Sequence, residues 1–333
     1  MKSFFDCTLS EIAVVLRSPA RARRLYRAVY REEGLSVADR AALSQFDLSL
    51  PHVVDRFDSA DGTRRFLLRL EDGATVESVA IPEAQRFTFC VSSQIGCALA
   101  CQFCLTGKLG LTRNLSAAEI VSQVQVQLAA AERTANRFSV VFMGMGEPLQ
   151  NYDNVLKAVR ILADDHGLAL PLRRITLSTA GLVPAIQRLA RENSFPNISI
   201  SLTGATNKKR DRLMPINQKY PIETVLEAVR GMPTSRRKRV MFEYVMIKGE
   251  TDSLDDAQNL CELLVELGCK VNLIPLNESP DIDFRRSDRE DILRFQRVLL
   301  ERHIPTFIRK TRGDDVYGAC GQLKKHGAGL DWR

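Results

Sequence analysis

One stretch decides the fold of this chain: Cys97-Ala98-Leu99-Ala100-Cys101-Gln102-Phe103-Cys104, which follows the first strand of a repeating strand–helix pattern. Thiolates bind iron–sulfur clusters and zinc, so three of them in one short loop can converge on a single soft metal centre. A zinc site would need a fourth ligand from a distant Cys or His. A four-iron cluster held by three cysteines would leave one iron open. The spacing predicts a metal-bearing loop.

Outward from this loop, apolar strand patterns alternate with amphipathic helix patterns. Strands are predicted at 87–92, 139–143, 174–178, 197–202, 240–246, 270–275 and 306–309. Helices are predicted at 116–133, 153–165, 183–192, 222–230, 254–267 and 287–301. Six βα units of this spacing predict a parallel sheet with right-handed crossovers. Periodicity leaves open whether the sheet curls into an incomplete barrel, but in either case ligands bind beyond the carboxyl ends of the strands.

The N-terminal region has a different pattern. It predicts short amphipathic helices at 10–16, 19–32 and 36–46. A hairpin is predicted from strands at 63–71 and 75–81, joined by the turn signal Asp72-Gly73. We therefore expect two parts: residues 1–80, a helical domain with a hairpin, and residues 81–333, an α/β domain.

Charge and composition narrow the class of partner. The chain has 333 residues and a formal net charge of +7. Its basic residues cluster at Arg17, Arg21, Arg23, Arg24, Arg27 and Arg31, at Lys208-Lys209-Arg210, at Arg236-Arg237-Lys238-Arg239, and at Arg309-Lys310 with Arg312. One such cluster is commonly a solvated face, but several together favour a polyanionic partner such as RNA.

No apolar run is long enough to cross a bilayer, and the first residues carry no cleavable leader, so we expect a cytoplasmic protein without membrane contact. In that compartment, the eight cysteines are expected as metal or redox ligands or as buried apolar groups. Cys261 and Cys269 fall in or beside a helical apolar pattern and are assigned to the core.

Polar residues recur where successive predicted strands end. They are Gly146 and Glu147, Ser178, Ser201 with Leu202 and Thr203, and Asn277. Each alone is typical of a turn or a helix cap. Their recurrence at one end of successive strands is what the active rim of a β/α fold requires, and Glu147 can accept a hydrogen bond from an ammonium group.

Further motifs carry a family resemblance over nearly the whole chain. They are Cys90-Val91-Ser92-Ser93-Gln94-Ile95-Gly96-Cys97, Gly144–Leu149, Leu177-Ser178-Thr179-Ala180-Gly181, Met214-Pro215-Ile216-Asn217, Arg312-Gly313-Asp314-Asp315 and Ala319-Cys320-Gly321-Gln322-Leu323. Together they resemble the RlmN/Cfr family of radical S-adenosylmethionine RNA (adenine) methyltransferases. The resemblance implies an α/β fold, namely a partial (β/α)6 barrel of the radical SAM type, with a small N-terminal helical domain that binds RNA.

The resemblance also implies cofactors and partners. It implies a [4Fe–4S] cluster on Cys97, Cys101 and Cys104, and two S-adenosylmethionine molecules per turnover at the polar strand ends. The implied substrate is an adenine carbon in 23S ribosomal RNA, with transfer RNA as a second substrate. An electron donor such as flavodoxin and a monomeric state are expected.

In the family, roles that match Cys320, Cys90 and Glu77 carry the reaction. By this match Cys320 is first methylated, and a radical then takes hydrogen from its methyl group so that the carbon adds to the base. Glu77 accepts a proton, and Cys90 attacks Cys320, forming a disulfide and releasing the product. Methylation is expected at carbon 2, and carbon 8 remains an alternative. A third hypothesis is a non-catalytic iron–sulfur protein that binds RNA. The pair Cys90 and Cys320 argues against it, because binding alone does not need them.

Two departures from the family pattern lie in this rim. Thr203-Gly204 stands where the family usually has His-Ala, and Glu278 follows Asn277 where the family has proline. Both changes bear on the RNA target and not on the radical chemistry.

Overall fold

The computed structural model describes residues 1–84, 86–131, 137–234 and 239–324. Its centre is a ten-stranded sheet whose strands follow the order β14 (Thr306–Ile308), β13 (Lys270–Pro275), β12 (Met241–Met246), β11 (Asn197–Ser201), β10 (Ile175–Thr179), β9 (Phe138–Phe142), β6 (Arg86–Cys90), β5 (Thr75–Glu83), β4 (Arg64–Arg69) and β3 (His52–Asp58). The seven strands from β14 to β6 pair in parallel, which confirms the predicted βα series. Within the described residues β14 and β3 are the two edges, so the barrel is partial and not closed.

The hairpin does not belong to a separate N-terminal unit. Strands β4 and β5 pair antiparallel, as predicted, and β5 then pairs with β6 and so joins the main sheet. The predicted boundary near residue 80 therefore falls inside β5. The additional strand β3 was not predicted from the sequence, because each of its residues is exposed or only half-buried and no buried face marks the strand.

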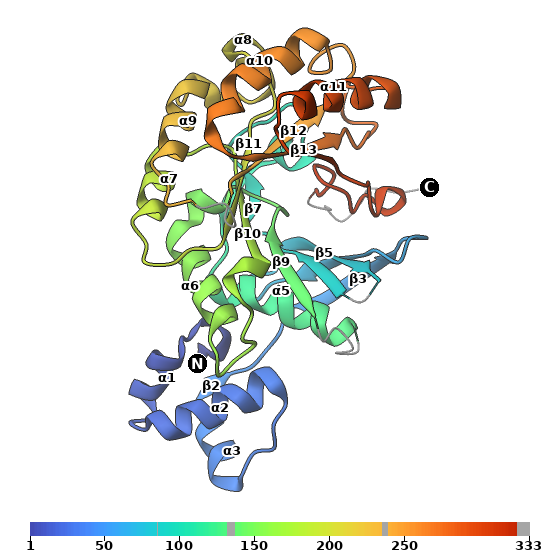
Figure 1. Ribbon diagram of the computed structural model, residues 1–333. Coiled ribbons are helices and arrows are strands. Elements are labelled where there is room, and N and C mark those ends of the chain that lie inside the picture. The colour runs from blue at the N-terminus through green and yellow to red at the C-terminus, as the bar shows by residue number, and fades with distance from the viewer. Residues whose placement is uncertain (85, 132–136, 235–238, 325–333) are drawn as a thin grey trace.

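Helices cover the outer face of the parallel strands (Figure 1). They are α5 (Ala117–Ala130), α6 (Tyr152–Ala163), α7 (Val183–Ala190), α9 (Ile222–Arg230), α10 (Leu254–Leu264) and α11 (Arg289–Glu301). All six were predicted. The short helix α8 (Asn207–Leu213) was not, because its sequence Asn-Lys-Lys-Arg-Asp-Arg-Leu has no apolar stripe.

The N-terminal helices form their own group at the end of the molecule beyond α6 (Figure 1). They are α1 (Leu9–Val15), α2 (Pro19–Arg31) and α3 (Val37–Leu43). Arg31 donates hydrogen bonds to the carbonyl oxygens of Gly167, at 2.7 Å, and Asp165. Lys157 of α6 lies 3.2 Å from the carboxylate of Glu11. These bonds dock the helical group on α6 and on the loop that follows it.

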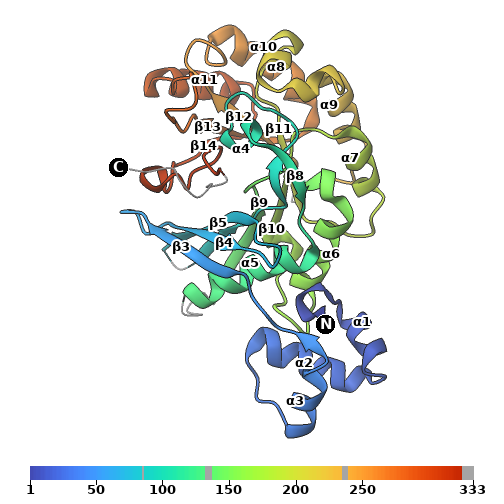
Figure 2. The same cartoon turned by 180° about the vertical axis from the view of Figure 1, so that it is seen from behind.

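A small antiparallel pair closes the base of the cysteine loop. It consists of β7 (Gln94–Cys97) and β8 (Gly110–Asn114), with α4 (Leu105–Lys108) between them, and it lies in front of the main sheet in Figure 2. Gly96 has a φ of +77°, and a Cβ there would lie 1.8 Å from the carbonyl oxygen of Gly110. Only glycine permits this approach, so Gly96 holds the two ends of the loop together.

Candidate functional site

Three cysteines line one pocket, here called the three-cysteine pocket. Cys97 ends β7, Cys101 lies in the following turn, and Cys104 precedes α4. Burial raises the pKa of Cys97 to about 12 and raises the pKa of the other two thiols. Among the described residues no three Cys, His, Asp or Glu side chains are grouped to hold one metal ion.

The carboxyl ends of the parallel strands supply the rest of this pocket. Gly146, Glu147, Ser178, Ser201 and Asn277 all line it, as the strand-end pattern predicted. Leu202 and Thr203 do not appear in the lining. Thr203 is fully buried, and its hydroxyl accepts a hydrogen bond of 3.3 Å from the main-chain N–H of Val245. Thr203 therefore lies in the barrel wall behind the pocket, and its contact with a ligand stays a prediction.

Glu147 is fixed before any ligand binds. One carboxylate oxygen accepts from the N–H of Leu149 at 2.9 Å, and the other accepts from the N–H of Ala180 at 2.8 Å. Burial raises the pKa of Glu147 to about 7, although these N–H groups oppose the shift. A carboxylate held in this way can accept a hydrogen bond from the ammonium of an amino-acid ligand.

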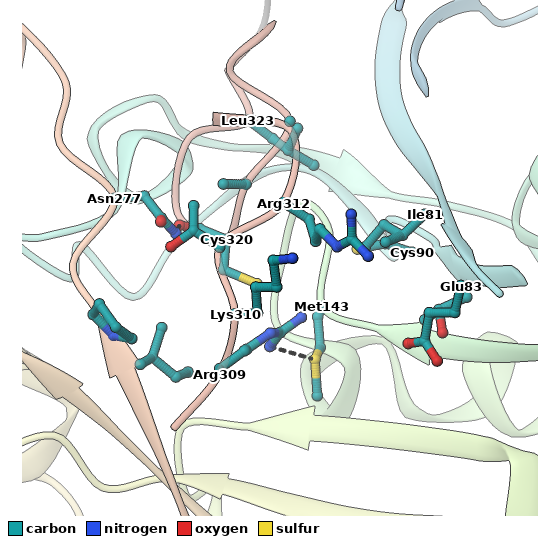
Figure 3. Close-up of a pocket in the computed structure, with 16 residues that line it drawn as sticks. Ile81, Glu83, Cys90, Met143, Asn277, Arg309, Lys310, Arg312, Cys320 and Leu323 are labelled. Atoms are coloured by element: carbon teal, nitrogen blue, oxygen red, sulfur yellow. Dashed lines mark hydrogen bonds between the residues drawn. The ribbon is translucent and has the colours of Figure 1, made fainter. Parts of the chain in front are cut away.

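A second cavity, here called the Cys90 pocket, adjoins the first and has a volume of about 340 Å³. Cys90 lines it from the end of β6, and Cys320 lines it from the C-terminal segment (Figure 3). Cys320 also lines the three-cysteine pocket and so lies where the two meet. Both thiols are free in the structure, so the disulfide that the resemblance implies is not formed here.

The hairpin side of the fold holds the segment that carries Cys320. The carboxylate of Asp61 accepts a hydrogen bond of 3.2 Å from the N–H of Gly313. The carboxylate of Asp315 accepts from the hydroxyl of Ser59 at 2.6 Å and from the N–H of Ala60 at 3.0 Å. The turn between β3 and β4 therefore anchors the start of the C-terminal segment.

The cysteine loop holds the other end of that segment. The N–H of Leu105 donates to the carbonyl oxygen of Gly321 at 2.7 Å, and the hydroxyl of Thr106 donates to the carbonyl oxygen of Leu323 at 2.5 Å. Because Leu105 follows the third cysteine directly, the three-cysteine loop and the Cys320 segment are hydrogen-bonded neighbours.

Glu77 lies deeper than its implied role suggested. It is fully buried on β5, and its carboxylate pairs with Arg65 of β4. It also accepts a hydrogen bond of 2.8 Å from the main-chain N–H of Lys324. Glu77 lines neither pocket. The structure therefore shows a carboxylate that ties the C-terminal segment to the sheet, and its catalytic role stays a prediction.

Two charged residues of the site were not predicted from the sequence. Glu243 lies inside β12, lines the three-cysteine pocket and accepts a hydrogen bond of 3.3 Å from the hydroxyl of Ser178. Arg309 follows β14 and lines the Cys90 pocket. Glu243 could have been found, because an acidic residue inside the apolar strand 240–246 is unusual. Arg309 gave no such signal, because in the sequence it is one member of a basic cluster.

The basic clusters have several different environments. Arg210 is fully buried and donates to the carbonyl oxygens of Leu202, at 2.9 Å, and Ala180, at 2.6 Å. Lys209 pairs with Asp256 at 2.6 Å. Buried Arg210 is therefore not part of a surface cluster, whereas the half-buried Lys209 is already paired. Arg236, Arg237 and Lys238 lie outside the described residues.

The arginines of α2 also divide. Arg24 and Arg21 lie 3.1 and 3.6 Å from Asp39 of α3, and Arg31 docks the helix on the loop after α6. Arg23 and Arg27, one helical turn apart, are exposed. The arginine cluster predicted from the sequence is therefore partly used for internal contacts.

The donor set fits an iron–sulfur cluster and an adenosylated amino acid. Three thiols from one loop face the pocket, and Glu147 lies in the same lining. The side-chain oxygen of Asn277 is buried there and has no hydrogen-bond partner within the described part of the chain. An orphaned acceptor of this kind suits an amino or hydroxyl donor of a bound ligand.

Comparison with known proteins agrees with this geometry. The profile of the radical SAM superfamily matches residues 91–264. The crystal structure of a radical SAM methyltransferase from Sphaerobacter thermophilus superposes with a TM-score of 0.90, at 40% sequence identity, over 97% of this chain and 99% of that chain. The protein is therefore a radical SAM enzyme, and a [4Fe–4S] cluster and S-adenosylmethionine are its cofactors.

Curated relatives identify the family within the radical SAM superfamily. The dual-specificity RNA methyltransferase RlmN of Geobacter sulfurreducens is 46% identical over 91% of this chain and 86% of its own length. The RlmN protein of Nitratiruptor sp. is 41% identical over 99% of this chain and 100% of its own. The chain belongs to the RlmN family and is a radical SAM RNA methyltransferase. No helix of the described residues is long and apolar enough to span a membrane.

Proposed function

We propose that this protein methylates carbon 2 of an adenine in 23S ribosomal RNA, and in transfer RNA as a second substrate, through an S-methylcysteine on Cys320. The observation that carries the proposal is the place of Cys320, which lines both the three-cysteine pocket and the Cys90 pocket. A residue that receives a methyl group at one site and passes it to a base at another must face both. The name dual-specificity, which the relatives carry, supports two RNA substrates.

Each proposed role follows from a contact or a position. Cys97, Cys101 and Cys104 hold the cluster, and Glu147 accepts from the ammonium of S-adenosylmethionine. When bound, the two cofactors supply a methyl group and a 5′-deoxyadenosyl radical. Gly146 has a φ of +94°, and a Cβ there would lie 2.4 Å from the side chain of Gln94, so its glycine keeps this rim tightly packed.

The remaining strand-end residues complete the binding site in this proposal. Ser178, Ser201 and Asn277 offer hydroxyl and amide groups to S-adenosylmethionine from the pocket lining. Leu202 and Thr203 support the wall of the pocket without lining it. Leu202 is fully buried, and its carbonyl oxygen accepts a hydrogen bond from Arg210. In this proposal the side chain of Thr203 does not take over the contact of the histidine that the family usually has at this position.

The Cys90 pocket is the proposed site of the target adenine. Lys310 and Arg312 line it and give its mouth a positive charge that suits the RNA backbone. In this proposal Cys320 presents its methyl group there, and the thiol of Cys90, which lies in the same lining, attacks the sulfur of Cys320. Glu77 is the proposed proton acceptor, and it acts from beneath the C-terminal segment that it binds through Lys324.

Two cysteine variants test the proposal because they should fail differently. Cys320→Ala should form neither methylated base nor RNA adduct, since no transferable methyl group is installed. Cys90→Ala should trap RNA covalently on Cys320, because the carbon adds to the base but no thiolate follows. Mass spectrometry of the adduct and of digested RNA distinguishes 2-methyladenine from 8-methyladenine. Normal methylation by both variants would disprove the mechanism, and 8-methyladenine would correct the position.

A flavodoxin-type electron donor and a monomeric state remain part of this proposal. Anaerobic turnover with reduced flavodoxin and size measurement of the loaded enzyme in solution test them directly.

A further inference from the structure

Arg309 brings a positive charge to the two thiols of the Cys90 pocket. Its guanidinium lies 3.6 Å from the sulfur of Met143 and 3.8 Å from the carboxylate of Glu243. Figure 3 shows the side chain extending toward Met143, and Cys320 lines the same cavity. About a quarter of the side chain, 26%, is exposed. The guanidinium is therefore held from two sides and also faces the cavity.

Both thiols are influenced by this charge. The pKa of Cys90 is raised to about 12, chiefly by burial and also by the neighbouring Cys320, while Arg309 lowers it. Burial also raises the pKa of Cys320, and again Arg309 lowers it. The pKa of Arg309 itself is raised, chiefly by Cys320. Arg309 is thus the cation that opposes the desolvation of both sulfur atoms.

Besides Arg309, other charged groups line the pocket or lie beside it. Glu243, from β12, acts against both thiolates. Glu83, from β5, and Lys310 line the pocket. Arg312 lines it as well, but its guanidinium lies 3.6 Å from Asp61.

We propose that Arg309 is a positioning residue that stabilises the Cys90 thiolate when the cysteine pair releases the methylated base. The inference rests on the proposed function. In that step the electron pair of the Cys90 thiolate forms the sulfur–sulfur bond with Cys320, and the bond from the Cys320 sulfur to the methylene carbon breaks. That electron pair stays with the carbon, which takes up one proton and becomes the methyl group. The thiol proton of Cys90 is released, so the cysteine pair is oxidised by two electrons and the carbon is reduced by two.

Cys90 needs this charge more than Cys320 does at that moment. Once Cys320 carries the methylene bridge its sulfur is an uncharged thioether, and Cys90 is the one thiolate of the pair. A thiol with a pKa of about 12 is almost wholly protonated at neutral pH, and only the thiolate attacks a sulfur atom. Because Arg309 in the same cavity lowers the pKa of Cys90, it raises the thiolate fraction without a proton transfer of its own.

The test follows the fate of the covalent RNA adduct in Arg309→Gln. Resolution should slow at least tenfold, so the enzyme isolated from cells should carry RNA that survives denaturation. When the isolated adduct is incubated between pH 7 and pH 10, its decay should accelerate about tenfold per pH unit, because the rate follows the Cys90 thiolate. Arg309→Lys retains the charge and should accumulate less adduct.

Matched variants separate the possible causes. The Cys90→Ala adduct should not decay at any pH, and Arg297→Gln, an exposed arginine of α11, should accumulate none. If Cys90→Ala itself traps no RNA, the proposed function fails. If it does while Arg309→Gln does not, only this inference fails. An Arg309→Gln adduct that is stable at every pH, or an unmethylated Cys320 in that variant, would also overturn the inference, since the arginine would then serve geometry or the first methyl transfer.

Discussion

The side-chain amide of Asn277 donates a hydrogen bond of 3.0 Å to the main-chain carbonyl oxygen of Cys320. Asn277 follows β13 and lines both pockets, as Cys320 does. One amide therefore fixes the main chain of the cysteine at the junction between the three-cysteine pocket and the Cys90 pocket, and its orphaned oxygen remains available to a ligand.

Asn277→Asp should lower methylation of Cys320 about tenfold and leave the cluster intact. The change removes the donor and places a carboxylate against a carbonyl oxygen, and a hydrogen bond of this kind contributes about 1 kcal/mol. The measurement is the methyl content of the Cys320 peptide after anaerobic incubation with S-adenosylmethionine. Asn197→Asp is the matched control, because Asn197 donates a similar bond of 2.8 Å to the carbonyl oxygen of Arg173 on the surface. Equal effects of the two variants would contradict the assignment.

The cluster should require all three cysteines of the loop. Purified without oxygen, the protein should hold about four irons and four sulfides. Replacing Cys97, Cys101 or Cys104 by Ala should abolish the brown absorbance, the bound iron and the activity together. Cys261→Ala should retain all three, because Cys261 is buried between α10 and α11. Stoichiometric zinc without sulfide in the anaerobic protein would refute the cluster.

The anchor at Asp61 should give a pH-dependent contribution to stability. Burial would raise the pKa of Asp61, but hydrogen bonds from Thr63, Gly313 and Ser59 lower it to about 2. Because the folded pKa lies below the unfolded value of about 3.9, the stabilisation is present above pH 4 and is lost as pH falls from 4 toward 2. In a Cys97→Ala background, which removes the acid-labile cluster, Asp61→Asn should reduce the free energy of unfolding by about 1 to 2 kcal/mol at pH 7.

Urea unfolding at pH 7 and at pH 2 measures that difference. At pH 2 the two proteins should differ by much less, since much of the wild-type carboxylate is then protonated. An unchanged difference at the two pH values would show that Asp61 contributes through packing and not through its charge.

Arg23 and Arg27 should carry the RNA contact of α2. They are exposed one helical turn apart, whereas Arg24 pairs with Asp39 and Arg31 docks the helix. Removing both charges, as Arg23→Gln with Arg27→Gln, should weaken RNA binding and reduce the slope of log affinity against log salt by about two. The same double change at Arg297 and Arg302, which are exposed on α11 and at its end, is the control. An unchanged slope would show that Arg23 and Arg27 are solvated surface charges that do not contact RNA.

Glu77 can be tested for catalysis apart from its structural pair. Glu77→Gln removes the carboxylate that pairs with buried Arg65 and should cost about 3 kcal/mol of stability. Adding Arg65→Met should recover much of that loss, because no buried charge is then left uncompensated. If Glu77 is the proton acceptor, the double variant should fold, bind its cluster and install the methyl group on Cys320, yet form no methylated RNA. Restored methylation in the double variant would assign Glu77 to structure alone.

Much of the fold was predictable because its signals are local. The apolar strands from β6 to β14 and the six covering helices follow from periodicity within single segments. Strand β3 and helix α8 were missed because neither has an apolar stripe. The place of the hairpin was missed for another reason: its pairing with β6 is a contact between segments, and no local pattern specifies it.

The candidate site also contains residues that were predictable from local sequence and residues that were not. The cysteine loop and the strand-end residues Gly146, Glu147, Ser178, Ser201 and Asn277 were predicted, since the carboxyl ends of parallel strands meet at one edge of a sheet. Thr203 was assigned to the lining by its position alone, and its hydroxyl instead bonds to Val245. Arg210 was taken for a surface charge, because sequence shows a charge but not the carbonyl groups that surround it.

By itself, the sequence determined the βα series, the three-cysteine loop and the presence of two further cysteines with family-matching neighbours. Each of these is written in residues close together along the chain. Only the tertiary structure decided that Cys320 lies between two pockets, that Arg309 lines one cavity together with Cys320 and Cys90, and that Glu77 is buried against Arg65. These relationships join segments far apart in sequence, and they depend on how the chain folds back over the sheet, where burial and neighbouring charge set the reactivity of each group.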